Sequence, residues 1–218
     1  MDKNYYQKIF STERMQKYFD RYPDKEKLAI THYHCNIELS ESFYPTISML
    51  EVALRNSLNR ELTDYFGTND WYLKMKSEVG LRNLKNEIQT AEKHINNRGE
   101  TITASKVVAE LTLGFWVRLL NAEYERVLWK PLRKAFPYLE KNKRQRHVVS
   151  APINKIRNFR NRIFHHEPIC WNLNELEKTH KNILLVMGWL NKDLPEIAKH
   201  NDRVAEVIKN CKVKLAEG

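Results

Sequence analysis

The sequence predicts an all-α fold. We expect one helical domain over residues 1–218, in which N-terminal helices over about residues 1–66 can form a subregion. Hydrophobic residues make up 42% of the chain and aromatic residues 11%, which is enough for a packed core. Six glycines and seven prolines are few for this length and argue against a many-stranded β protein. Apolar residues recur at helical spacing, and β-alternation is nowhere sustained.

Each expected helix is an apolar pattern of helical period, and several have capping or turn residues at an end. Ser40–Ser42 can cap the helix expected over about residues 40–67, and Gly67 ends it. The turn residues Asn96–Gly99 end the helix expected over about residues 79–95, and Thr103 or Ser105 can cap the one over about 103–111. The expected helices cover about residues 25–39, 40–67, 79–95, 103–111, 115–120, 141–165, 171–190 and 196–215.

Composition excludes several classes of protein. No run of about 18 apolar residues exists, so no membrane span is expected. The stretch Met1–Tyr6 has no apolar signal core, which argues against secretion. Cys35, Cys170 and Cys211 are odd in number and widely spaced, so neither a disulfide framework nor a zinc knuckle is indicated. We therefore expect a cytoplasmic protein with ordinary thiols.

The net charge of +10 comes from one segment. Residues 130–162 hold eleven Lys or Arg and a single acid, Glu140, so the rest of the chain sums to zero. A basic block of this kind is typical of a surface that binds a polyanion such as nucleic acid. The alternative is a solvated helix face whose charge keeps the protein soluble.

The basic block leads into the segment Lys155–Ile169, KIRNFRNRIFHHEPI, which combines cations, amides and imidazoles. Arg160 offers a fixed cation, Asn161 an amide and His165 an imidazole that can take or give a proton. A metal-free ribonuclease needs such groups to hold a phosphate, to orient it and to move a proton. Pro168 disfavours helical geometry in the residue before it, so we expect His165 in a last helical turn near a surface edge.

Two other interpretations of this segment stay open. Arg157, Asn161 and His165 are four residues apart, and their stripe can be a solvated basic face whose histidine compensates the helix dipole. His165 and His166, with His147 upstream, offer metal-ligand atoms. Adjacent histidines on a helix point about 100° apart and rarely share an ion, so no metal site is expected.

Two further sets of residues have both a packing and a functional interpretation. Glu51 and Arg55 are four residues apart on an apolar helix, where they form a stabilising ion pair or orient groups of an active site. Six tyrosines crowd the N-terminal fifth of the chain and can either pack in the core or stack bases. They are Tyr5, Tyr6, Tyr18, Tyr22, Tyr33 and Tyr44.

Over nearly its whole length the chain resembles the Abi-like proteins of bacterial abortive infection, a branch of the HEPN superfamily of helical ribonucleases. Glu51–Asn56 is similar to the family's early Glu/Arg/Asn helix. Phe115–Trp116 and Leu128–Trp129 are similar to its middle section, and Arg157–Ile169 to its signature segment. The resemblance implies a HEPN-like helical bundle with additional N- and C-terminal helices.

The resemblance also implies an activity, that of a metal-independent endoribonuclease of phage defence or of toxin type. The RNA 2′-hydroxyl would attack the adjacent phosphate, and no cofactor is expected. The HEPN catalytic pattern falls on Arg160, Asn161 and His165, with His165 as general base or acid and Arg160 on the phosphate. The residues expected to contact substrate are Arg157, Arg162, His166, Lys143, Arg144 and Arg146.

The expected partners also follow from the resemblance. It implies a homodimer in which two copies of the motif meet and neither chain cleaves alone, and an RNA or protein antitoxin, with no membrane partner. Some HEPN toxins carry a tyrosine two residues after the histidine, which a nucleotidyltransferase antitoxin modifies. Glu167 stands there in this chain, so that control is not expected. A non-catalytic RNA-binding or RNA-sensing protein is the alternative function, and a non-nuclease structural bundle is a third.

Overall fold

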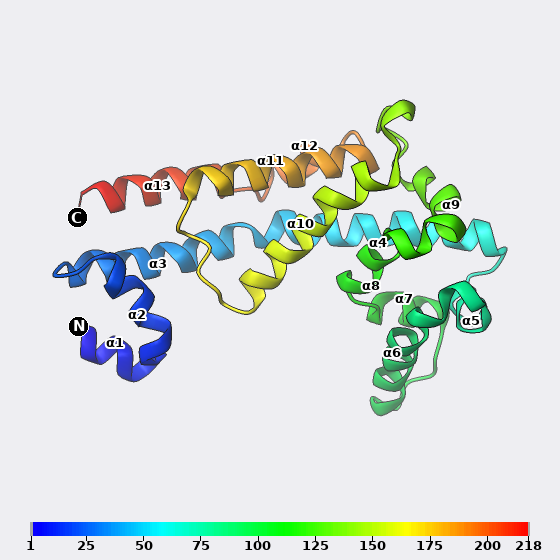
Figure 1. Cartoon of the computed structure of the whole chain (residues 1–218), viewed down its shortest axis with the longest axis horizontal. Coiled ribbons are helices and arrows are strands. Elements are labelled where there is room, and N and C mark those ends of the chain that lie inside the picture. Colours follow the sequence, from blue (N-terminus) through cyan, green and yellow to red (C-terminus); the bar gives the residue numbers. More distant parts are fainter. Residues whose placement is uncertain (1, 218) are drawn as a thin grey trace. The chain divides into compact units, whose positions relative to one another are not determined.

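The computed structural model describes residues 2–217, apart from the side chain of Val79, and these residues form helices and turns without a β-strand (Figure 1). This confirms the all-α prediction. No helix in the described part of the chain is long and apolar enough to cross a membrane. The α-helices are α1 Lys3–Phe10, α2 Thr12–Arg21, α3 Glu26–Ser42, α4 Tyr44–Phe66, α5 Trp71–Ser77, α6 Lys85–Asn97, α7 Ala104–Glu110, α8 Leu113–Arg118, α9 Lys130–Leu132, α10 Arg146–Phe164, α11 Leu173–Leu190, α12 Leu194–Ala198 and α13 Val204–Ala216. The short 3₁₀ and π elements are η1 Val79–Leu84, η2 Ala122–Tyr124, η3 Glu125–Trp129, η4 Arg133–Ala135 and η5 Lys141–Lys143.

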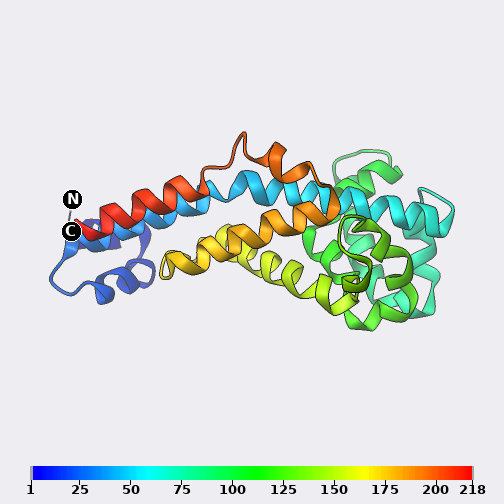
Figure 2. The same cartoon turned by 90° about the horizontal axis from the view of Figure 1, so that it is seen from above.

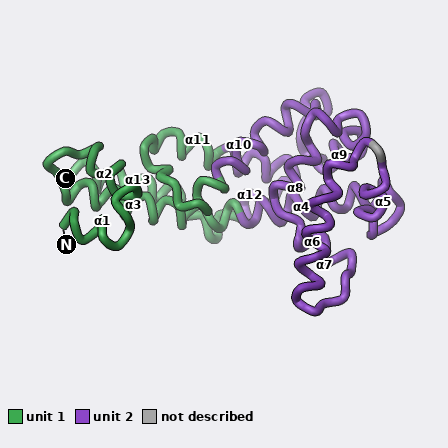
Figure 3. The backbone as a smooth tube through the Cα atoms, turned by 60° about the horizontal axis from the view of Figure 1, so that its bottom comes forward, with its two compact units in different colours: residues 1–47, 160–181, 198–218 green, residues 48–159, 182–197 purple. Residues whose placement is uncertain are grey.

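The chain divides into two compact units, and each is assembled from separate stretches of sequence (Figure 3). Unit 1 comprises residues 1–47, 160–181 and 198–218, and unit 2 comprises residues 48–159 and 182–197. Helices α4, α10 and α11 each pass from one unit into the other along the chain. The boundary within α10 falls between Phe159 and Arg160, so the end of this helix belongs to unit 1.

Unit 1 is organised around α3, which packs against α2 and, as Figure 2 shows, runs beside α13. Its core contains Met15 and Tyr18 from α2, Leu39 from α3 and Cys211 from α13, all at most 1% exposed. The Tyr18 ring lies 5.0 Å from the ring of Trp171, centroid to centroid. The loop that follows α10 therefore packs on the helices at the N-terminal end of the chain.

Unit 2 has a core of leucines and large aromatic side chains. Leu54, Leu58 and Leu62 are four residues apart on α4 and form the buried stripe that their spacing predicts. The rings of Trp71 and Trp116 are also buried, and their centroids lie 5.8 Å apart. Phe115 and Leu128, from the same part of the sequence, are buried as well.

Helix α10 begins at Arg146, later than the expected start near Lys141. The guanidinium group of Arg144 donates to the carbonyl oxygens of Leu139, at 2.7 Å, and Pro137. These bonds hold the preceding segment as a separate 3₁₀ turn instead of a continuation of the helix. Thr103 caps α7 as predicted, because its hydroxyl oxygen accepts the N–H of Lys106 at 3.4 Å.

Candidate functional site

The candidate site lies at the C-terminal end of α10, where Arg160, Asn161 and His165 fall together in unit 1. The helix ends at Phe164, and the N–H of His165 still donates to the Asn161 carbonyl at 2.9 Å. His165 is therefore the residue that immediately follows the last turn, and its side chain is exposed. An exposed imidazole at a helix end can be reached by a substrate or by a second chain.

A tight turn closes the helix directly after His165. The N–H of His166 donates to the Ile163 carbonyl at 2.9 Å, and the N–H of Glu167 donates to the Arg162 carbonyl at 2.8 Å. This pair of bonds is the Schellman arrangement, which requires a left-handed residue after the helix. Glycine usually occupies that position, but here it is His166, with a φ of 55°.

Arg162 and His166, which are both expected to contact substrate, have structural partners in this turn. The Nε of Arg162 donates to a carboxylate oxygen of Glu167 at 3.3 Å, and its Nη2 donates to the Pro168 carbonyl. The carbonyl of His166 accepts a hydrogen bond from Nη1 of Arg14, on α2, at 2.8 Å. The turn is thus closed by Arg162 from within and by Arg14 from a neighbouring helix.

A buried amide fixes the loop that follows the turn. The side-chain oxygen of Asn36, on α3, accepts the backbone N–H of Ile169 at 2.7 Å, and both residues are buried. A buried N–H needs such a partner, so this single side chain sets where the loop crosses α3. The asparagine could not be singled out from the sequence, because its partner lies more than a hundred residues away along the chain.

Arg160 and Asn161 interact with each other and with an aromatic ring. The guanidinium carbon of Arg160 lies 4.0 Å from the centroid of the Phe164 ring, a cation–π contact along the helix surface. Its Nη1 is 3.5 Å from the amide oxygen of Asn161, a long hydrogen bond. The guanidinium and the amide are half-buried, so both have restricted freedom before any ligand arrives.

A layer of buried polar side chains lies beneath the turn. The hydroxyl of Tyr22 is 3.0 Å from Nδ1 of His32, and Nε2 of His32 is 3.3 Å from the Cys170 carbonyl. Burial lowers the pKa of His32 and raises the pKa of the Cys170 thiol to about 12. Burial also raises the pKa of Tyr18. The layer is therefore neutral near physiological pH and adds no charge to the site.

The other predicted site residues belong to unit 2. Arg146 donates through Nε to Glu125 at 2.8 Å and through Nη1 to the hydroxyl of Ser150 at 3.0 Å. Lys143 forms an exposed ion pair with Glu140 at 2.9 Å. Arg144 holds the turn before α10, as described above. These three cations take part in local structure, which charge counting along the sequence does not reveal.

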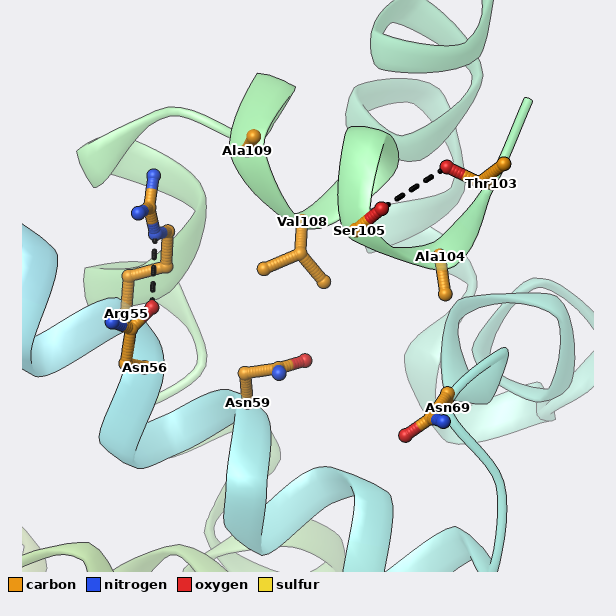
Figure 4. Close-up of a pocket in the computed structure, with 9 residues that line it drawn as sticks. All are labelled: Arg55, Asn56, Asn59, Asn69, Thr103, Ala104, Ser105, Val108 and Ala109. Carbon is orange, nitrogen blue, oxygen red and sulfur yellow. Dashed lines mark hydrogen bonds between the residues drawn. The ribbon is translucent and has the colours of Figure 1, made fainter. Parts of the chain in front are cut away.

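Arg157, Glu51 and Arg55 also lie in unit 2. Arg157 is half-buried on α10, and its Nη2 donates to the side-chain oxygen of Asn158 at 3.1 Å. On α4, Nε of Arg55 donates to the side-chain oxygen of Asn56 at 3.3 Å. Arg55 and Asn56 line a polar pocket of about 540 Å³ (Figure 4). Its other polar side chains are Asn59, Asn69, Thr103 and Ser105.

One group of side chains among the described residues has the composition of a metal-ligand set. The sulfur atoms of Cys35 and Cys211 and a carboxylate oxygen of Glu38 lie within 4.8 Å of one another, between α3 and α13. Nζ of Lys214 donates to both oxygens of Glu38 at 2.8 Å. The carboxylate thus already has a cationic partner, and the set does not include His165.

The comparisons with known proteins add no family to these observations: no family model, curated protein or solved structure matches the chain. The case for a function therefore rests on the exposed His165 after α10 and on the cation and amide in the turn before it.

Proposed function

We propose that this protein is a metal-independent endoribonuclease of the HEPN type, related to the Abi-like proteins and acting in phage defence or as a toxin. The observation that carries the proposal is the exposed imidazole of His165 directly after the last turn of α10, with Arg160 and Asn161 in the same unit. The bundle would then be of the HEPN type, with additional helices at both ends.

In this mechanism the RNA 2′-hydroxyl attacks the adjacent phosphorus, and the 5′-oxygen of the next nucleotide leaves. His165 takes the proton from the hydroxyl or gives one to the leaving oxygen, because an imidazole can act as a general base or as a general acid. Arg160 stabilises the charge that develops on the phosphate oxygens. Asn161 orients the guanidinium group or the phosphate. Unpaired RNA is the substrate, because in-line attack needs a backbone that can leave A-form geometry.

A homodimer would complete the site. One chain supplies a single His165, whereas phosphodiester transfer benefits from both an acid and a base. A two-fold axis beside the end of α10 would provide two imidazoles from one sequence. Two basic surfaces would then face each other, so we expect RNA or apolar contacts to offset their repulsion.

The first test is cleavage of labelled total RNA by the purified protein in EDTA. We expect products with 2′,3′-cyclic phosphate ends. His165→Ala should slow cleavage by about 10²–10⁴-fold and spare RNA binding, since the imidazole moves protons. His147→Ala, an exposed histidine at the start of the same helix, is the matched control and should cleave normally.

Four results would contradict parts of the proposal. Activity that is lost in EDTA and restored by manganese refutes the metal-free mechanism. A His165→Ala chain that keeps more than roughly a tenth of the wild-type rate refutes the assigned role. RNA binding without cleavage favours the non-catalytic RNA-binding alternative. For the dimer, an Arg160→Ala chain mixed with a His165→Ala chain should recover partial activity, and a fully active monomer would exclude the shared site.

A further inference from the structure

Unit 1 contains an apolar groove beside the turn that follows α10. Its volume is about 750 Å³, and its walls come from α1, α2, α3, the start of α4, the end of α10 and the turn after it. Four of its apolar side chains are well exposed: Phe10 at 38%, Ile37 at 48%, Tyr44 at 58% and Phe164 at 45%. A contiguous apolar surface with polar groups at its border marks a binding site more often than a scattered set of exposed residues does.

Aromatic rings dominate this groove. The ring of Phe10 lies 5.2 Å from that of Tyr33, and the ring of Tyr44 lies 6.4 Å from that of Phe164, centroid to centroid. Phe164 is the ring that also carries the guanidinium group of Arg160. Aromatic rings accompanied by arginine are the groups on which unpaired nucleobases stack.

A smaller polar cavity of about 280 Å³ shares Arg14 and His166 with the groove. Its lining also includes His165 and Lys17. It holds two acids, Glu13 in the first turn of α2 and Glu167, which is paired with Arg162 at 3.3 Å. A cavity with arginine, lysine and histidine in its lining suits a phosphate, and the groove suits a base. The two shared residues therefore join a polar compartment to an aromatic one, which is the pattern that a nucleotide of RNA requires.

We propose that the aromatic groove binds an unpaired nucleobase of the RNA, next to the phosphate that lies at His165. This inference rests on the proposed function, because it assigns a subsite to the same substrate. Tyr44, Phe164 and Phe10 line the subsite, and stacking on them selects single-stranded RNA. Any base can stack, so the subsite adds affinity with little sequence preference.

Charge favours RNA over a second copy of this chain as the occupant. Arg14 lines the groove, and Arg160 lies over one of its rings. The acid in the lining, Glu41, is already paired with Arg203 at 2.7 Å. A second copy of the same surface would present the same cations, whereas the phosphates beside a stacked base complement them.

The experiment measures binding of two fluorescent probes to His165→Ala protein, which should not cleave them. One probe is a short oligoadenylate, and the other is an oligomer of the same length without bases. We expect Tyr44→Leu to weaken oligoadenylate binding about tenfold and to leave abasic binding unchanged, because only stacking is lost. Phe10→Leu is a second variant with the same expectation. Tyr138→Leu is the matched control, since Tyr138 is 53% exposed in unit 2, and it should leave both affinities unchanged.

The subsite is refuted if Tyr44→Leu and Phe10→Leu bind both probes as the parent does. It is also refuted if Tyr44→Leu converts an RNA-free dimer into a monomer, as seen by sedimentation, while the two probes bind equally well to the parent. In that case the groove is an interface between copies. Base-dependent binding that is lost in Tyr44→Leu supports the subsite even if wild-type protein cleaves no RNA. Absence of cleavage by the wild-type protein would refute only the nuclease activity.

Discussion

The left-handed residue after α10 allows a quantitative test of how the candidate site is built. His166 has a φ of 55°, a conformation that costs an ordinary L-residue about 1–2 kcal/mol and costs glycine almost nothing. Glycine also makes the unfolded chain more flexible, which offsets about 0.4–1 kcal/mol of that gain. We therefore expect His166→Gly to raise the free energy of unfolding by about 0.5–1 kcal/mol.

Urea denaturation followed by circular dichroism measures this change, and the thermal midpoint should rise by about 1–4 °C for a chain of this size. His165→Gly is the control for stability. His165 is not among the described residues with positive φ, so glycine there relieves no strain and should lower the free energy of unfolding. Equal destabilisation by both substitutions would refute the assignment of strain to His166. Loss of RNA cleavage in a stabilised His166→Gly chain would assign a substrate contact to the imidazole.

Three further perturbations have defined outcomes. Asn36→Ala removes the acceptor of the buried Ile169 N–H, so the free energy of unfolding should fall by about 1–3 kcal/mol in urea denaturation. Burial lowers the pKa of His32, so below its ordinary value of 6.5 the unfolded state binds more protons than the folded state. Stability should therefore be retained above that pH and fall below it, and a denaturation series over pH should lose this slope in His32→Gln. Lys17→Ala should reduce the slope of log affinity for single-stranded RNA against log salt by about 0.7, in titrations at several salt concentrations.

The helices are largely predictable from the sequence, because their determinants are local. Leu54, Leu58 and Leu62 recur every four residues, and the side chain of Thr103 caps the helix that begins beside it. The late start of α10 was missed, because the bonds of Arg144 to two backbone carbonyls leave no periodic signal. The assembly into two units from separate stretches was not predicted either.

The sequence likewise predicted only part of the candidate site. Helical spacing and Pro168 placed His165 at a helix end close to Arg160, and the structure agrees on that position. The charge count could not tell which cations are free for a ligand, since Arg146 pairs with Glu125 on another element. A cation that is already paired inside the fold adds less to binding than the sequence suggests.

By itself the sequence determined where most of the longer helices lie and which chemical groups gather at the end of α10, because both depend on residues a few positions apart. It did not locate α1, α2 or α5. Tertiary structure alone decided that Arg14 and Asn36 hold the turn and its loop, and that Phe10 and Tyr44 form a groove beside them. These contacts join segments that are distant in sequence. No local periodicity encodes such contacts, and only the packing of α1, α2, α3, the start of α4 and the end of α10 within unit 1 brings the groups together.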